Sequence, residues 1–169
     1  MLGLDVDTKR HLLCHFLAAL AYRTQKALRG APANFAAFRA GPKVRTPHEL
    51  VAHMASVLGY ARTFFTGGEW RPPLKTRFED EITGFHDILE DLKRRLEAGT
   101  SLRGITEEQL LQGPLADALT HAGQLAMLRR LAGSPVPPEN FIYAEIRPEN
   151  LGPDQPAPVR PDAVWPERP

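Results

Sequence analysis

The stretch LKTRFEDEITGFHDILEDLKRRLEAG, residues 74–99, decides the fold of this chain. Its large apolar residues recur at alternating steps of four and three positions, the spacing of a helix face that packs against neighbouring helices. These residues are Phe78, Ile82, Phe85, Leu89, Leu92 and Leu96. Gly99 ends the pattern. We therefore predict a helix over residues 74–98 within a helical bundle.

Two more helical patterns precede this one, over residues 6–29 and 46–66. The second opens with Thr46-Pro47-His48-Glu49, in which the threonine caps the helix, the proline suits its first turn and the glutamate completes a capping box. A fourth pattern, PLADALTHAGQLAMLRRLAG, covers residues 114–133 after a short helix over residues 106–112. Four long helices and no strand pattern predict an all-α protein.

The character of the chain changes after residue 133. Residues 134–169 hold ten of the sixteen prolines, so helices and strands are not expected there. Phe141, Ile142 and Tyr143 are apolar enough to dock on the bundle. We predict one domain over residues 1–152, followed by an extended tail over residues 153–169 that Trp165 anchors.

Composition restricts the class of protein. The 169 residues suit one domain with a core, and the net charge of +1 without long basic runs gives no sign of nucleic-acid binding. The single cysteine, Cys14, rules out an intrachain disulfide and a cysteine-rich zinc site. No stretch resembles a signal peptide or a membrane span. We expect a cytoplasmic protein that does not associate with membranes.

The histidines of the first helix are four residues apart, a spacing that allows two side chains to share a metal. However, His11 and His15 fall opposite the leucine face, beside Tyr22, Gln25 and Lys26. We therefore interpret this pair as part of a solvated face.

The last helix carries polar residues where core contacts are expected. Arg129 and Arg130 mark its outer side, whereas Asp117, His121 and Gln124 fall within the inner stripe. That inner stripe is marked by Leu125, Leu128 and Leu131. A buried carboxylate costs several kcal/mol unless it is paired or binds a metal. Two interpretations remain open here: the side chains satisfy one another, or they hold an ion.

The second helix adds another inward histidine. His53 lies at the edge of the inner face, whereas His48 lies on the far side and His86, on the third helix, is assigned to the surface or rim. His53, Asp117 and His121 would form a three-ligand metal site with open positions, as in reactive metal sites. Tyr60 and Gln124 lie near the same stripe, where they would orient a ligand or contact bound water, or else serve as ordinary boundary residues.

The motifs TPHELVAHM, which contains His53, and DALTHAGQLAMLRRLAG, which contains His121, resemble those of the DinB-like or YfiT-like metalloenzymes. Members of that family carry one histidine on the second helix and two, four apart, on the fourth, often followed by Arg-Gly-Gln. The resemblance covers about residues 5–145. It implies a four-helix bundle with a long crossover connection, a divalent metal, often zinc or nickel, and a homodimer. Some members use low-molecular-weight thiols such as mycothiol or bacillithiol in transferase or isomerase reactions on small molecules.

The chain departs from the family pattern at two positions. Asp117 stands where the family usually has the first histidine of the pair, and Ala122 replaces the arginine. A ligand set of two histidines and a carboxylate moves the metal preference toward manganese or iron(II).

Two hypotheses of function therefore stay open. One is a metal-dependent enzyme, a thiol S-transferase or hydrolase. The other is a non-catalytic helical-bundle binding module, in which the polar stripe is a metal-free network.

Overall fold

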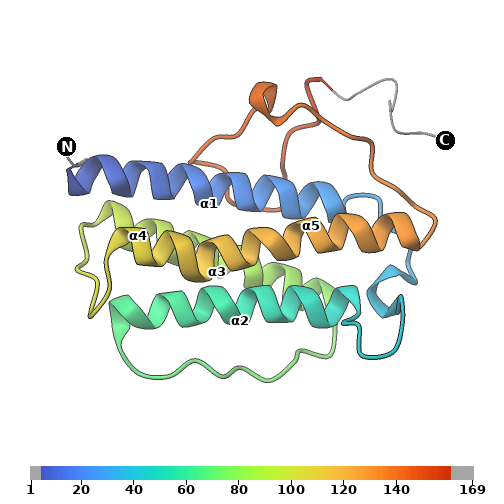
Figure 1. Cartoon of the computed structure of the whole chain (residues 1–169), viewed down its shortest axis with the longest axis horizontal. Coiled ribbons are helices and arrows are strands. Elements are labelled where there is room, and N and C mark those ends of the chain that lie inside the picture. Colours follow the sequence, from blue (N-terminus) through green and yellow to red (C-terminus); the bar gives the residue numbers. More distant parts are fainter. Residues whose placement is uncertain (1–4, 161–169) are drawn as a thin grey trace.

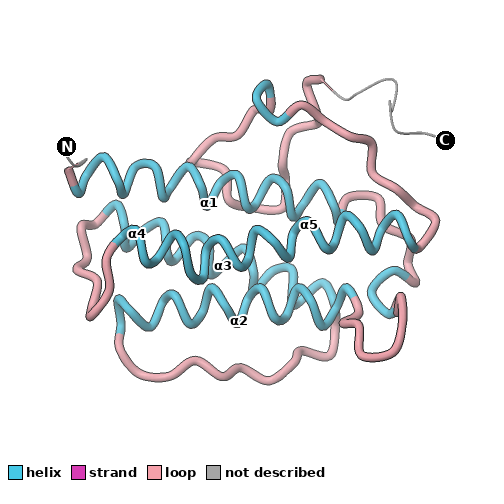
Figure 2. The backbone as a smooth tube through the Cα atoms, viewed as in Figure 1, coloured by secondary structure: helices cyan, strands magenta, loops and turns pink. Residues whose placement is uncertain are grey.

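The computed structural model describes residues 5–160, and this part of the chain is helical without any strand (Figure 1, Figure 2). The four long helices are α1 (Val6–Leu28), α2 (Pro47–Thr66), α3 (Phe78–Glu97) and α5 (Ala116–Leu131). Short elements complete it: η1 (Phe35–Ala37), α4 (Glu107–Leu110), the π-turn η2 (Leu111–Leu115) and η3 (Phe141–Tyr143). The prediction of an all-α protein with four long helices is confirmed.

The four helices pack side by side around one core, with α1 against α3 and α5, and α2 against the same two helices. In Figure 1, α1 and α5 run in one direction, and α2 and α3 run in the other. Because α2 and α3 are parallel, residues 67–77 return along α2 before α3 begins. Within the described residues, no helix combines the length and the apolar character that a membrane span requires.

The second helix starts as its sequence predicts. Thr46 Oγ1 accepts a hydrogen bond from the Glu49 backbone N–H at 3.2 Å, and a Glu49 carboxylate oxygen accepts from the Thr46 N–H at 2.7 Å. These two bonds form the capping box and satisfy N–H groups that the helix itself leaves without partners.

The third helix begins at Phe78, four residues later than the predicted start at Leu74. Leu74 is exposed, so no core contact favours extending the helix through it. Residues 67–77, which form the crossover between α2 and α3, are instead held against the bundle. Trp70 lies over Gly59, where an added Cβ would come within 2.0 Å of the indole nitrogen. Lys75 lies over Gly84 in the same way.

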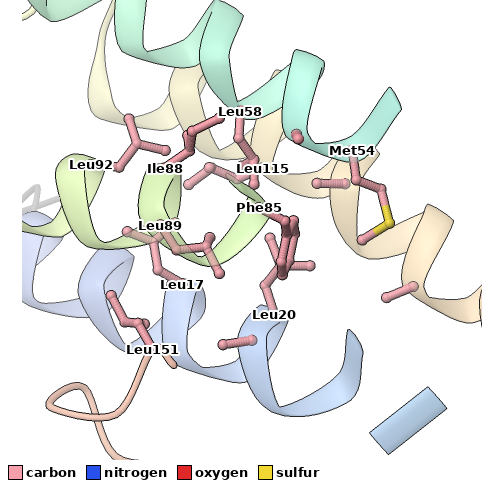
Figure 3. Packing of buried hydrophobic residues seen from close by; sticks show 14 of the residues in the cluster. Leu17, Leu20, Met54, Leu58, Phe85, Ile88, Leu89, Leu92, Leu115 and Leu151 are labelled. Atoms are coloured by element: carbon pink, nitrogen blue, oxygen red, sulfur yellow. The ribbon is translucent and has the colours of Figure 1, made fainter. Parts of the chain in front are cut away.

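The core is built on the apolar helix face that the sequence pattern of residues 74–99 predicts. Figure 3 shows Phe85, Leu89 and Leu92 of α3 pointing between α1 and α2, and all three are buried. Leu151 of the C-terminal segment reaches the same core and is completely buried. The bundle therefore depends on a residue that lies outside every long helix.

The junction between the helices predicted over residues 106–112 and 114–133 takes the form of a single π-helical turn. Proline lacks the N–H for an intrahelical hydrogen bond, and the wider turn over residues 111–115 joins α4 directly to α5 around it. Gly113 takes up the distortion, with φ −90° and ψ −105°. Such turns are frequent beside functional sites, and this one ends at Leu115, two residues before Asp117.

Residues 134–160 return along α1 (Figure 1), and parts of this segment also contact α5. Glu139 is buried and accepts hydrogen bonds from the Tyr22 hydroxyl at 2.7 Å and from Lys26 Nζ at 2.6 Å. Phe141 docks edge-on against Tyr22, but Ile142 and Tyr143 are exposed, so only one of the three predicted contacts forms. Residues 161–169, with Trp165, lie outside the described part of the chain.

Three assignments made from helical periodicity are wrong. Tyr22 and Arg129, predicted on outer faces, are buried, whereas Leu131, predicted on the inner face, is exposed. Arg129 donates hydrogen bonds to the carbonyls of Ala27, Arg29, Gly30 and Ser134 and to the Ser134 hydroxyl. It thereby satisfies carbonyls at the end of α1, which would otherwise lack partners.

Candidate metal centre

Two helices bring three side chains with metal-binding atoms together. His53 projects from α2 and His121 from α5, and their ring centroids are 4.7 Å apart with an interplanar angle of 74°. Asp117, one turn before His121, places Oδ1 3.4 Å from His121 Nε2. One ligand atom from each residue lies within 4.8 Å of the others. The three residues selected from the sequence are therefore neighbours in space.

Gln124 fixes the orientation of His121. The Gln124 Oε1 atom lies 3.1 Å from His121 Nδ1. Because an amide oxygen only accepts hydrogen bonds, Nδ1 carries the proton and donates it. Nε2 is then the ring nitrogen that faces Asp117, and it carries a lone pair whenever the ring is neutral. A histidine whose second nitrogen donates to a fixed acceptor is the usual arrangement of a metal ligand.

When the His121 ring is neutral, Asp117 Oδ1 and His121 Nε2 are two acceptors facing each other, which is unfavourable unless a cation lies between them. A proton on Nε2 would supply that charge, and so would a divalent ion. Two ligands at about 2.1 Å from a tetrahedral ion lie about 3.4 Å apart. The observed separation of 3.4 Å therefore fits coordination without rearrangement of this pair.

The cluster opens to solvent on one side. His121 is buried, His53 is partly buried, and the Asp117 side chain is 49% exposed. His53 also lines a cavity of about 510 Å³ beneath the crossover, together with Trp70 and Lys75. Neither Asp117 nor His121 lines this cavity, so a small molecule would reach the cluster over the exposed Asp117 side chain.

This exposure corrects the prediction for α5. Asp117 and Gln124 were expected in the buried stripe, yet both are exposed, and only His121 of the three is buried. The reason is that the buried stripe is narrow, consisting mainly of Ala118, Ala122, Leu125 and Leu128. The carboxylate and the amide lie at its rim, exposed to solvent.

The electrostatic surroundings keep His53 available as a ligand. Burial lowers the pKa of His53, and the positive charge of Arg45 and the proximity of His121 lower it further, while Asp117 opposes them. The imidazole is consequently neutral at pH 7, which is the form that binds metals.

Gln124 and Tyr60, the two residues predicted to assist the site, differ in whether they contact it. Gln124 contacts His121 directly. Tyr60 lies two helical turns beyond His53, about 10 Å along the axis. Its ring is exposed and packs against Phe64, with centroids 4.9 Å apart. The geometry therefore gives Gln124 a contact with the cluster and gives Tyr60 none.

The remaining histidines lie away from the cluster. His11 and His15 are exposed, as predicted. His48 is only partly exposed, because its ring packs against Phe78, with centroids 5.6 Å apart. His86, assigned to the rim, is buried, and its Nδ1 lies 2.5 Å from the Leu151 carbonyl oxygen. The prolines around Leu151 gave no periodic signal that would have revealed this contact.

Comparisons of the chain with models of known families, with curated proteins and with solved structures found no match.

Proposed function

We propose that this protein is a divalent-metal-dependent enzyme of the DinB-like type, with His53, Asp117 and His121 as the metal ligands. The observation that supports it most directly is the convergence of their ligand atoms within 4.8 Å. The contact from Gln124 to His121 adds to this, because it leaves Nε2 free for coordination.

The donor set determines which metals fit. Two imidazoles and one carboxylate bind zinc, as in several hydrolytic enzymes, and also suit manganese and iron(II). The family resemblance favours zinc or nickel, whereas Asp117 in place of a histidine favours the harder ions. Three protein ligands leave coordination positions for water or a substrate, as in catalytic rather than structural sites.

The chemistry we propose is thiol S-transfer or hydrolysis on a small molecule. A divalent ion in an open site lowers the pKa of a water or thiol ligand and so supplies a nucleophile at neutral pH. Cys14 is not suited to provide the thiol, since it is buried and its burial raises its pKa. A low-molecular-weight thiol is therefore the proposed co-substrate of the transferase.

The test of the ligand set is metal content by mass spectrometry on protein purified without an affinity tag. We expect about one metal per chain in the wild type and its loss in His121→Ala. His15→Ala is the matched control, because His15 is an exposed histidine of α1, and it should retain the metal. Absence of metal from the wild type, even after incubation with zinc, nickel, manganese and iron(II), would contradict the proposal.

If His53, Asp117 and His121 form a polar network without a metal, the non-catalytic binding module is the function that remains. The distance of 3.4 Å between Asp117 Oδ1 and His121 Nε2, which allows an ion pair when the imidazole is protonated, is the observation in its favour. A metal-loaded protein would next be screened with bacillithiol, mycothiol and glutathione against electrophiles, and with ester substrates. Metal-dependent turnover in one set distinguishes transferase from hydrolase.

A further inference from the structure

A separate cavity of about 220 Å³ lies between α1, α5 and the segment after α5. Figure 1 shows α1 and α5 side by side, with that segment returning along α1. Most of the lining is small or apolar: Ala27, Leu119, Ala122, Ala126, Val136 and Pro137. Gly123 also lines it, and a Cβ added there would meet no atom within 4 Å. Gly123 therefore borders open space that a larger side chain at this position could occupy.

The charged groups of this cavity are unequally matched. Arg23, Lys26 and Arg130 line it, with Glu139 as the one carboxylate. Glu139 is already engaged by Lys26 Nζ at 2.6 Å and by the Tyr22 hydroxyl. Beyond the pair of Lys26 with Glu139, Arg23 contributes a further positive charge to the lining.

Arg23 is the group that a ligand would reach. Its guanidinium stacks on Phe141, 3.7 Å from the ring centroid, and it forms no ion pair with another residue in the range 5–160. Stacking on Phe141 occupies one face of the guanidinium and leaves its N–H edge for a planar acceptor. Burial lowers the pKa of Arg23, and the nearby charge of Glu139 offsets only part of this effect.

We propose that this cavity binds an organic carboxylate with a short apolar body, whose carboxylate pairs with the edge of Arg23. A carboxylate matches the guanidinium with two parallel hydrogen bonds. The alanines, Leu119 and Val136 would surround the apolar body. The site shares no ligand residue with His53, Asp117 and His121, so it stands independently of the proposed metal centre.

The test is calorimetric titration of the full chain with benzoate, benzamide and inorganic phosphate at low ionic strength. Benzoate should bind about tenfold more tightly than benzamide, because only the anion gains charge-assisted hydrogen bonds. Arg23→Gln should abolish this preference. Arg71→Gln, which removes an exposed arginine of the crossover, should leave it unchanged.

Gly123→Leu provides a second variant that does not depend on Arg23. Leucine improves helix propensity, and its side chain enters the open space, so the protein should fold while losing benzoate binding. The proposal is overturned if benzoate does not bind, if benzamide binds equally well, or if Gly123→Leu binds benzoate like the wild type. Phosphate binding as tightly as benzoate would also overturn it, because the apolar body would then contribute nothing.

Discussion

The network of Tyr22, Lys26 and Glu139 and the cluster of His53, Asp117 and His121 both join polar side chains from different elements, but one is closed and the other open. The Glu139 side chain is completely buried, and both of its oxygens accept short hydrogen bonds. Asp117 is half exposed, and its carboxylate faces His121 Nε2. A closed polar network fixes a segment, whereas an open set of acceptors retains the capacity to bind a cation.

Removal of Glu139 should give the largest effect. Glu139→Ala leaves the Lys26 ammonium and the Tyr22 hydroxyl near the core without their partner, which should cost about 3–5 kcal/mol in the free energy of unfolding. Urea denaturation measures this loss. Glu145→Ala removes a carboxylate from an exposed pair with Arg147 and should cost less than about 0.5 kcal/mol. Equal losses would mean that the closed network does not fix the segment.

The second-largest effect should be the stabilisation by bound metal, which depends on the histidine cluster and not on the Glu139 network. Zinc at a free concentration of 100 times its Kd should raise the free energy of unfolding by about 2.7 kcal/mol. This gain should vanish in Asp117→Asn plus His121→Ala and persist in Glu139→Ala, as followed by thermal unfolding with and without a chelator. Loss of the gain in Glu139→Ala as well would show that the two sites are not independent.

Two helical glycines repeat the contrast between closed and open surroundings. Gly59 lies beneath Trp70, so Gly59→Ala must displace the indole and should destabilise the protein by about 1–3 kcal/mol. Gly123 lies beside open space, so Gly123→Ala should stabilise it by about 0.5–1 kcal/mol through helix propensity. Chemical denaturation of both variants checks the opposite signs, and equal signs would contradict the assignment of Trp70 to Gly59.

The smallest expected effect concerns pH. Burial lowers the pKa of His86 despite its hydrogen bond to the Leu151 carbonyl. The unfolded chain then takes up the proton first, so stability is complete above about pH 6.5 and falls as the pH drops below it. His86→Gln keeps an amide donor but does not titrate, and should flatten this dependence between pH 7 and pH 5. An unchanged slope in unfolding free energy against pH would exclude His86 as its source.

The sequence by itself determined the helices and the position of the candidate site. The apolar spacing around Phe85 and Leu89 and the capping box at Thr46 depend on local backbone geometry, which acts in any context. The same periodicity located His53 and His121 on faces that meet. It was correct about the cluster because both faces belong to long, regular helices.

Only the tertiary structure decided what covers each helix. Tyr22, His86 and Arg129 were assigned to outer faces, but residues 134–160 lie against them. Helical periodicity reports the side of a helix on which a residue lies, not whether an irregular segment packs there. Asp117 shows the converse: it lies on the inward side of α5, yet the stripe is too narrow to bury it, so its carboxylate remains open to water and to an ion.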